Sequence, residues 1–179
     1  MTVSRYEPDA VFEPASAGAR LRLATMVSLV VGALVPLVAL VVILNERRPA
    51  PWPALLAPAA APLVLAAVWI FSRIGRYRVS REEIVVELAV GVRRFALAGL
   101  QSVTPDPAAL RGAHKLVGND GLGALSGRFR SQHLGTFRAY LTDDARAVVL
   151  RWPDCCLVIS PQQHSLFVDT VRRRAGLSS

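Results

Sequence analysis

Two long runs without a charged side chain govern what this chain can fold into. Leu23–Leu44 and Pro49–Ser72 contain no Asp, Glu, Lys, Arg or His, and the short break Asn45–Arg48 separates them. A bilayer core of roughly 30 Å requires about 20 apolar residues in a helix, so each run is long enough to span it. A helix also satisfies its own backbone hydrogen bonds in hydrocarbon. The sequence therefore predicts an antiparallel membrane hairpin, with helices at about 23–44 and 50–72.

Two other interpretations of these runs fit the sequence less well. A buried helix pair in a soluble core fits poorly, because neither run has a polar face. A cleaved signal peptide has an apolar region of about 7–15 residues, which is shorter than the first run. A second apolar run also follows the first almost directly. We therefore expect the first helix to be retained as a signal-anchor, after a flexible N-terminal tail over residues 1–22.

Arginines beside the hairpin predict which side of the membrane carries the termini. The flanks outside the hairpin are richer in arginine than the break within it: Arg5, Arg20, Arg22, Arg73, Arg76, Arg78 and Arg81 against Arg47 and Arg48. The positive-inside rule then places both termini in the cytoplasm. The group Arg73, Arg76, Arg78 and Arg81 also supplies candidate contacts for lipid headgroups, each worth about 1 kcal/mol near the surface. Their alternative role is to set the topology alone.

Residues 73–179 are numerous enough for one small domain with its own core. Short runs rich in β-branched and aromatic residues, separated by turn residues, predict strands. The expected strands are Tyr77–Ser80, Ile84–Leu88, Val92–Leu97, Leu100–Thr104, Gly135–Leu141, Arg146–Trp152 and Cys155–Ile159. Residues 105–127 are rich in Pro, Gly and Asn and are expected to form a long irregular connection. Arg93 and Arg94 are expected to be solvated on a strand edge.

The C-terminal segment predicts a single helix. Ser160 is in a position to cap it, with Pro161 at the first helical position and Gln163 three residues after the cap. Apolar residues then recur on one face, including Phe167. Three consecutive arginines suit the negative end of the helix dipole, and Gly176 supplies the stop.

Several pieces, taken in order, match a known family. They are Tyr77–Ser80, Phe95–Ser102, Gly127–Phe129, Gly135–Thr142 and Leu157–Pro161, followed by Phe167. This order resembles the bacterial pleckstrin-homology (PH) domains found in small membrane proteins. The resemblance implies about seven antiparallel strands in a partly open barrel, capped by one C-terminal helix, and a non-enzymatic role. It also implies a multi-pass protein of the bacterial inner membrane with a cytoplasmic PH-like domain over 73–179.

The phosphoinositide sites of the wider superfamily use a basic loop between the first two strands of the domain. In this chain the corresponding loop is Arg81–Glu83, where two acids offset one base. We therefore carry no phosphoinositide site over to this loop.

A second group of basic residues is the candidate ligand or partner patch. Strand alternation places Arg128 and Arg130 on one face, with Arg111 and Lys115 nearby in the sequence. Paired arginines can hold a phosphate or carboxylate through bidentate hydrogen bonds. The glycine-rich stretch 118–123 resembles a phosphate loop only loosely, because it lacks the Gly-Lys-Ser/Thr ending. The alternative is a solvated loop whose charges face water.

Nucleic-acid, metal and cofactor functions find little support. The net charge of +8 comes almost wholly from arginine, and no aromatic side chains alternate with the C-terminal arginines as single-stranded nucleic-acid binding requires. Three histidines and the adjacent Cys155 and Cys156 do not form a metal-binding pattern. Adjacent cysteines on a strand point to opposite faces, so we expect one buried and one exposed thiol. We predict no cofactor, no metal and no nucleic-acid partner.

The sequence thus predicts a non-enzymatic, membrane-anchored binding or scaffolding module. Its expected partners are membrane lipids and a protein partner or a second copy of the chain. One alternative is an accessory subunit that packs through its hairpin on a larger membrane complex, helped by small residues in the second run. A more remote alternative is a thiol-dependent enzyme using Cys155 or Cys156 with His164.

Overall fold

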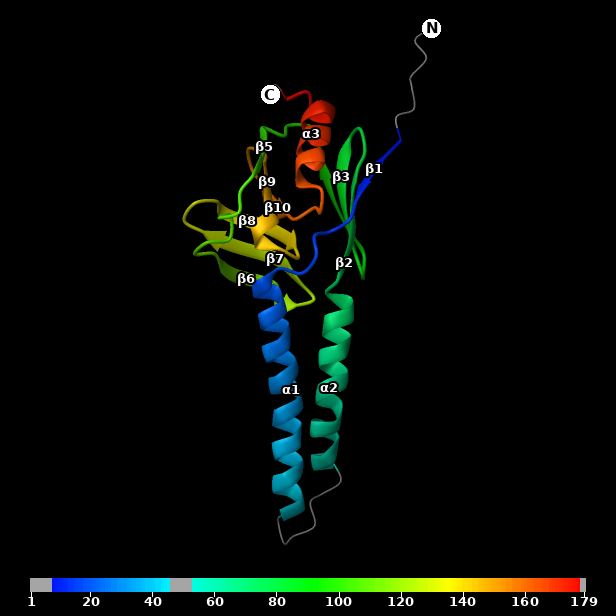
Figure 1. Cartoon of the computed structure of the whole chain (residues 1–179), viewed down its shortest axis with the longest axis vertical. Helices are drawn as coiled ribbons and strands as arrows, with labels where there is room; N and C mark the ends of the chain where they lie inside the picture. Colours follow the sequence, from blue (N-terminus) through cyan, green and yellow to red (C-terminus); the bar gives the residue numbers. More distant parts are fainter. Residues whose placement is uncertain (1–7, 46–52, 178–179) are drawn as a thin grey trace.

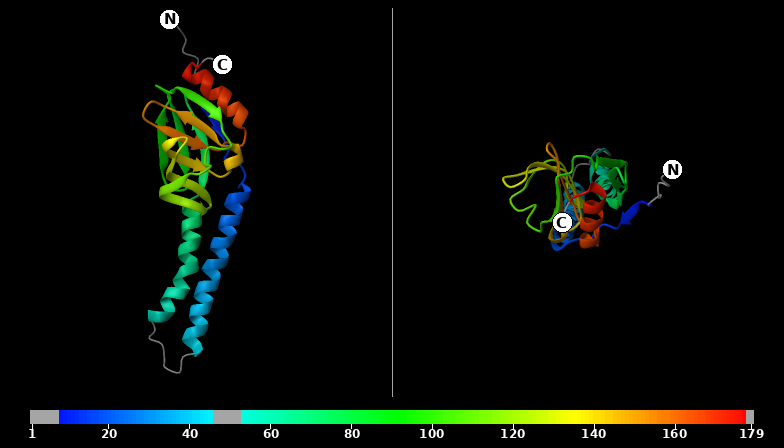
Figure 2. Two further views of the ribbon diagram at one scale, coloured as in Figure 1. Left: turned by 90° about the vertical axis from the view of Figure 1, so that its left-hand side faces the viewer. Right: turned by 90° about the horizontal axis from the view of Figure 1, so that it is seen from above.

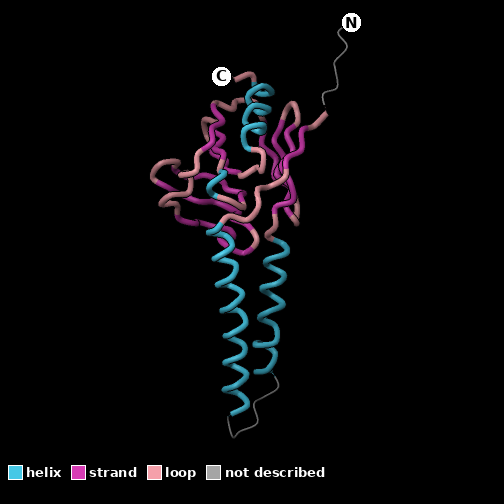
Figure 3. Tube along the Cα trace, in the orientation of Figure 1, coloured by secondary structure: helices cyan, strands magenta, loops and turns pink. Residues whose placement is uncertain are grey.

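Two helices project from one end of a β-rich domain (Figures 1 and 3). The computed structural model describes residues 8–45 and 53–177. Helices α1 (Ala19–Asn45) and α2 (Pro53–Phe71) lie side by side along the long axis. A Cβ placed on Gly32 of α1 would clash with the side chain of Leu65 on α2, which shows how closely the two helices approach. The break that joins the two predicted spans lies outside the described residues, apart from Asn45.

Helix α1 has the dimensions of a membrane span. Among the described residues it is the one helix long and apolar enough to cross a bilayer by length and composition, and its apolar stretch is fully unburied within the chain. The described apolar stretch of α2, Ala60–Phe71, is shorter. The first helix is also longer than predicted, because α1 begins at Ala19 rather than at Leu23.

The segment before α1 is part of the folded domain. Strand β1 (Ala10–Phe12) pairs antiparallel with β2 (Ile74–Val79), so residues 65 or more positions apart are neighbours. The amide of Ala15 donates to the Ser160 carbonyl at 2.8 Å, and Leu21 is buried. The expected flexible tail is therefore wrong for residues 10–22. Three residues of β1 are too few to give a pattern in the sequence, because a strand signal needs several alternating positions.

The domain contains two sheets, whose strands are shown in Figure 3. The four-stranded sheet has the order β1-β2-β3-β4, and the six-stranded sheet has the order β5-β9-β10-β8-β7-β6. Strands β8 and β10 pair in parallel, so the expectation of a wholly antiparallel sheet is wrong. The described residues form ten strands rather than about seven: beyond β1 and β2 these are β3 (Glu83–Leu88), β4 (Val92–Ala96), β5 (Ser102–Pro105), β6 (His114–Leu122), β7 (Ala124–Ser131), β8 (Gly135–Leu141), β9 (Val148–Arg151) and β10 (Cys156–Ile159).

Strands β6 and β7 replace most of the irregular connection expected over residues 105–127. Glycines in that stretch predicted loops, yet Gly118 and Gly127 face each other in the β6–β7 ladder. Their φ angles of +128° and +137° belong to backbone conformations that other residues rarely adopt. The two backbones approach so closely that a Cβ on either glycine would clash with the opposite strand. Glycine here allows two strands to approach closely, and does not mark the end of a strand.

The six-stranded sheet is covered on both faces. One face packs against the four-stranded sheet around Tyr77, Leu150 and Phe167. The other face carries a second core that includes Phe129 and Phe137, whose stacked rings lie 5.9 Å apart. Burial raises the pKa of Tyr77, so its phenol remains a hydrogen-bond donor, here to the Tyr140 carbonyl at 2.9 Å.

Helix α3 (His164–Ala175) closes one side of the two-sheet sandwich, at the end away from α1 and α2 (Figure 2). Phe167 meets Phe12 of β1 edge to face at 5.1 Å, and Arg172 donates to the Val103 carbonyl of β5 at 3.1 Å. Helix α3 therefore bridges the outer strands β1 and β5. Gly176 ends α3 in the left-handed conformation, as predicted.

Ser160 does not cap α3. The helix begins at His164, with Gln163 at the N-cap and no side-chain hydrogen bond there. The buried Ser160 hydroxyl instead accepts hydrogen bonds from the amides of Thr142 at 2.8 Å and Asp143 at 3.3 Å. The sequence predicts a cap at Ser160 because it does not reveal this contact with the end of β8.

This contact predicts a measurable cost. Ser160→Ala leaves two amide donors without their partner, and an unsatisfied buried donor costs about 1–3 kcal/mol. Gln163→Ala is the matched control, since the Gln163 side chain makes no cap hydrogen bond. We expect a lower thermal unfolding midpoint for Ser160→Ala alone, measured on the full chain in mild detergent. Equal midpoints for the two variants would contradict the role given to the serine.

Candidate functional site

The turn between β6 and β7 lies between the ends of α1 and α2. The Thr25 hydroxyl of α1 donates to the Gly121 carbonyl at 2.8 Å. On the other side, a Cβ on Gly123 would come within 2.9 Å of the Trp69 carbonyl oxygen of α2. The Asn119 side-chain amide donates to the carbonyls of Leu122 and Ala124 and shapes the turn. Strand β6 is thereby held against the helices (Figure 1).

The β3–β4 turn lies at the same end of the domain. Its Ala89 amide donates to the carbonyl of Arg73, just beyond the end of α2, at 2.8 Å. We call this part of the domain the helix-proximal face: residues 89–92 of the β3–β4 turn and strand β6. Chain segments far apart in the sequence meet here because α1 and α2 end side by side.

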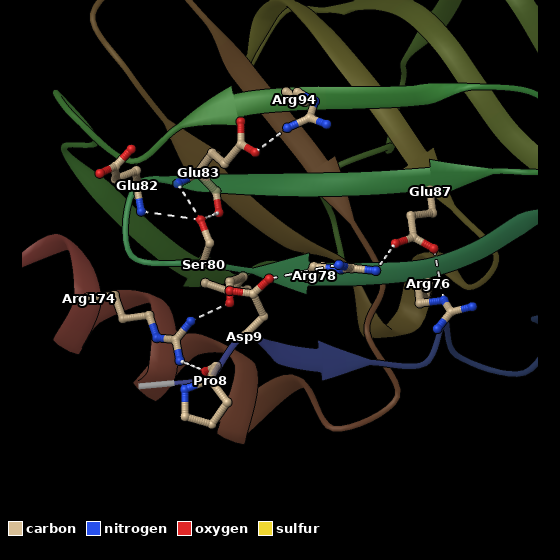
Figure 4. Close-up of polar contacts among 11 residues, drawn as sticks. Pro8, Asp9, Arg76, Arg78, Ser80, Glu82, Glu83, Glu87, Arg94 and Arg174 are labelled. Carbon is tan, nitrogen blue, oxygen red and sulfur yellow. Dashed lines mark hydrogen bonds and ion pairs between the residues drawn. The ribbon is translucent and has the colours of Figure 1, made fainter. Parts of the chain in front are cut away.

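Four arginines were predicted to contact headgroups, and the structure spreads them along β2. The Arg73 guanidinium lies over the Trp69 ring at 5.1 Å, next to the end of α2. Arg76 and Arg78 both bind Glu87, at 2.9 and 2.7 Å (Figure 4). Arg81 lies in the turn at the far end of β2. Because a strand rises about 3.3 Å per residue, β2 carries Arg81 about 20 Å from Arg73.

The outer face of the four-stranded sheet pairs its arginines with carboxylates. Besides the Glu87 pairs, Asp9 lies 3.8 Å from Arg78, and Glu83 binds Arg94 at 2.6 Å. Figure 4 shows these contacts, together with the hydrogen bond from Arg174 to the carbonyl of Pro8. The charge on this face is thus largely compensated.

The predicted basic patch is divided between two pockets. Arg111 and Arg130 line a pocket of about 770 Å³ with His114 and His133, which we call the turn pocket. Strand register places His114 opposite Arg130, and the buried Leu110 anchors the segment that presents Arg111. Lys115 is exposed on β6 and lines neither pocket.

The turn pocket also contains two imidazole groups, from His114 and His133. His133 Nε2 lies 3.8 Å from an Asp106 carboxylate oxygen, a contact that is ionic only when the imidazole is protonated. Its side chain is largely exposed, so the pair contributes little to stability. The arginines supply permanent positive charge that suits a carboxylate or phosphate.

Arg128 lies in a second pocket, of about 550 Å³, between the two sheets. We call it the inter-sheet pocket; its lining consists of Arg93, Val117, Gly118, Gly127, Arg128, Arg138 and Tyr140. Arg128 and Arg138 are directly opposite each other on β7 and β8. The Arg138 guanidinium lies over the Phe95 ring of β4 at 5.8 Å. The pocket occupies the side of the sandwich that α3 leaves open.

Arg93 and Arg138 were not among the predicted site residues. Arg93 is opposite the fully buried Val86, so it points to the inner face of its sheet, whereas the neighbouring Arg94 points outward to Glu83. Both residues are exposed on the outer strand β4, as predicted, and Arg93 in addition lines the inter-sheet pocket. The alternation of Arg93 with the apolar Phe95 was the available signal. The pairing of Arg138 with Arg128 depends on strand register, which the sequence does not reveal.

No carboxylate among the described residues lines the inter-sheet pocket. Within the described ranges, Arg93, Arg128 and Arg138 also form no ion pair, in contrast to the paired arginines of the outer face. Among the described residues, Arg93 donates one hydrogen bond, to the carbonyl of its neighbour Val92 at 3.4 Å. Three guanidinium groups without a carboxylate partner among the described residues therefore line this pocket, an arrangement whose charge suits an anion.

Cys156 lacks the environment of a reactive thiol. Burial raises the pKa of Cys156 to about 11, and Cys155 is half-buried. The described residues also contain no group of three or more His, Cys, Asp and Glu that could hold a metal ion. We expected one buried and one exposed thiol. Cys156 is the buried one, whereas Cys155 is half-buried rather than exposed.

The raised pKa predicts slow modification of Cys156. At pH 8 a thiol with a pKa near 11 is ionised to on the order of one part in a thousand, and the thiolate is the reactive form. We expect iodoacetamide to label Cys155 first, and Cys156 only as the pH rises toward 11 or the domain unfolds. Peptide mass spectrometry of a labelling time course measures this order, and faster labelling of Cys156 would contradict it.

Comparison with known proteins agrees with the architecture. The bacterial PH domain family matches residues 75–175, which is more than half of the chain and runs from β2 to the end of α3. The chain belongs to the bacterial PH domain family. No curated protein and no solved structure matches it. The PH domain explains the sheet-rich fold with a C-terminal helix, and such domains are typically non-catalytic binding modules.

Proposed function

We propose that this protein is a membrane-anchored, non-enzymatic binding module that presents its PH domain at the cytoplasmic surface of a bacterial inner membrane. Its expected ligands are membrane lipids and an acidic protein partner. The pairing of β1 with β2 is the observation that carries this proposal, since it constrains how the chain crosses a bilayer.

Strand β1 precedes α1, and β2 follows α2, yet the two strands are hydrogen-bonded neighbours. If α1 crosses a bilayer, the chain must return to the side where it started, because β1 and β2 share one sheet. In this proposal α2, which is 19 residues long and lies against α1, makes the return. The pairing also supports retention of α1, since cleavage after it would remove β1 from the PH domain.

The flanking arginines support a cytoplasmic location for the domain. Arg20 and Arg22 lie at the start of α1, and Arg73 follows α2, all at the end of the hairpin that carries the PH domain. Basic residues close to a span favour the cytoplasmic side. Arg73 is also placed to contact headgroups, while its ring partner Trp69 suits the membrane interface.

The turn pocket is the proposed contact for an acidic protein partner. Arg111 and Arg130 converge there, on a surface that the rest of the chain leaves accessible. Rim charges of this kind speed association and select partners of opposite charge more than they add affinity. In this role the membrane anchor holds the PH domain, and the domain recruits its partner to the bilayer.

The test of this function has two stages that use the full chain. Alkaline carbonate extraction and a reporter fused after Ser179 measure insertion and sidedness; extraction into the soluble fraction, or a periplasmic reporter, would overturn the proposal. Crosslinking in membranes then compares the intact chain with Arg111→Gln/Arg130→Gln, using Arg76→Gln/Arg94→Gln as a control of equal charge. We expect loss of a defined crosslinked partner only in the first variant. A partner retained by both variants would move the contact to the hairpin or another face.

A further inference from the structure

Exposed apolar side chains of the PH domain gather next to the helices. Outside α1 and α2, the large apolar side chains exposed among the described residues are Val11, Val90, Val92, Leu116, Val117 and Leu166. Four of these six lie on the helix-proximal face, with Val90 61% and Val117 69% exposed. In a soluble environment such residues would be in contact with water, whereas beside two apolar helices they can enter the interfacial layer of a bilayer.

The inter-sheet pocket opens between these two apolar segments. On one side, Arg93 directly follows Val92 at the start of β4. On the other side, Val117 is itself part of the pocket lining. Both strands that border the pocket are attached to the helix ends, because β4 follows the turn bonded to Arg73 and β6 contacts α1.

Charge distinguishes this pocket from the outer face of the four-stranded sheet. On the outer face of the four-stranded sheet, arginines are matched by Glu83 and Glu87. The described residues provide no such match for Arg93, Arg128 and Arg138. Clustered guanidinium groups repel one another, and their convergence is favourable once an anion binds between them.

We propose that the inter-sheet pocket binds the headgroup phosphate of an anionic glycerophospholipid from the bilayer that α1 and α2 cross. Arg93, Arg128 and Arg138 hold the phosphate oxygens, and the valines of the β3–β4 turn and of β6 lie among the adjoining acyl-chain ends. This site rests on the proposed membrane anchoring and adds a ligand class and a location. Its lining does not include the Arg81–Glu83 loop.

Membrane anchoring allows a weak contact between the pocket and a lipid to be occupied. The helices keep the pocket at the bilayer surface, where the local concentration of lipid headgroups is high. Each arginine near an anionic surface is expected to change lipid affinity about fivefold. Because bidentate arginine–phosphate bonds need the planar guanidinium fork, a neutral glutamine of similar length removes most of that effect.

The experiment uses the full chain in nanodiscs of phosphatidylcholine alone or mixed with phosphatidylglycerol, followed by hydrogen exchange of the β4 and β6–β7 peptides. Co-elution with the discs tests the anchoring itself. In inserted protein we expect slower exchange in both peptides when phosphatidylglycerol is present. Insertion without this protection would overturn the lipid site while leaving the proposed function intact, and failure to insert would overturn both.

Arg93→Gln and Arg94→Gln form a matched pair, since the two residues are adjacent on β4 and point to opposite faces. We expect Arg93→Gln to raise the phosphatidylglycerol fraction needed for half-maximal protection about fivefold, and Arg94→Gln to leave it unchanged. Equal shifts in both variants would reduce the effect to net charge and overturn the pocket assignment. A further arm adds inorganic phosphate to phosphatidylcholine discs; protection by phosphate alone, without phosphatidylglycerol dependence, would make the ligand a soluble anion.

Discussion

Gly127→Ala is expected to destabilise the PH domain by about 3 kcal/mol. The new Cβ would clash with the carbonyl oxygen of Val117 and lie 2.8 Å from the Cα of Gly118. The φ angle of +137° adds conformational strain, and such strain alone costs on the order of 1–3 kcal/mol. For a domain of about 100 residues, each kcal/mol lowers the thermal midpoint by roughly 4–8 °C. Thermal unfolding of the full chain in mild detergent measures the shift.

Gly135→Ala is the control that separates strain from collision. Gly135 also has a positive φ, of +67°, but no atom lies within 4 Å of the position its Cβ would take. We expect a loss of about 1 kcal/mol there, from the left-handed conformation alone. If the thermal midpoint of Gly127→Ala were as high as that of Gly135→Ala, β6 and β7 would separate easily. The close glycine pair Gly118 and Gly127 would then not be a rigid part of the inter-sheet pocket.

Phe12→Ala is expected to have a comparably large effect, from a residue outside the region matched to the PH family. Phe12 is only 5% exposed and meets the ring of Phe167, which is fully buried, at 5.1 Å. Truncation of a buried phenylalanine to alanine costs about 3–5 kcal/mol through lost burial and the cavity that remains. Denaturation of the full chain, followed by near-ultraviolet circular dichroism, reports this loss.

The neighbouring residue gives the matched control for β1. Val11 belongs to the same three-residue strand but is 51% exposed, so Val11→Ala is expected to change stability by less than about 0.5 kcal/mol. If Phe12→Ala were equally mild, the segment before α1 would be attached to the PH domain without stabilising it. Strand β1 would then be too weakly held to keep the two ends of the hairpin on one side of a bilayer, as the proposed function requires.

Local patterns in the sequence predicted the strands that lie in continuous apolar runs. Gly135–Leu141 was predicted with the bounds that β8 has, and Ile84–Leu88 lacks only the first residue of β3. In both strands, β-branched or aromatic residues recur with few glycines, so propensity and burial favour the same structure. Gly176 was likewise predictable as the end of α3, because the left-handed C-cap is a local requirement.

Features that depend on distant contacts were missed. Strand β1 forms only because β2, more than 60 residues later, offers a sheet edge. Strands β6 and β7 use glycine for close approach, a role that a sequence read along one strand assigns to a turn. The predicted basic patch is divided between two pockets for the same reason. Arg128 and Arg130 share a face of β7, but strand register and sheet packing bring Arg138 and Arg93 to Arg128.

The β1–β2 pairing also fixes the order in which this protein can be completed during synthesis. The ribosome makes β1 first, but its partner strand emerges only after α1 and α2, so β1 has no sheet to join until both helices have been made. If α1 and α2 cross a bilayer as proposed, closure of the PH domain follows insertion of the whole hairpin. A chain whose second helix then failed to insert would leave Phe12 and Phe167 on opposite sides of the bilayer, and the exposed core would favour its degradation.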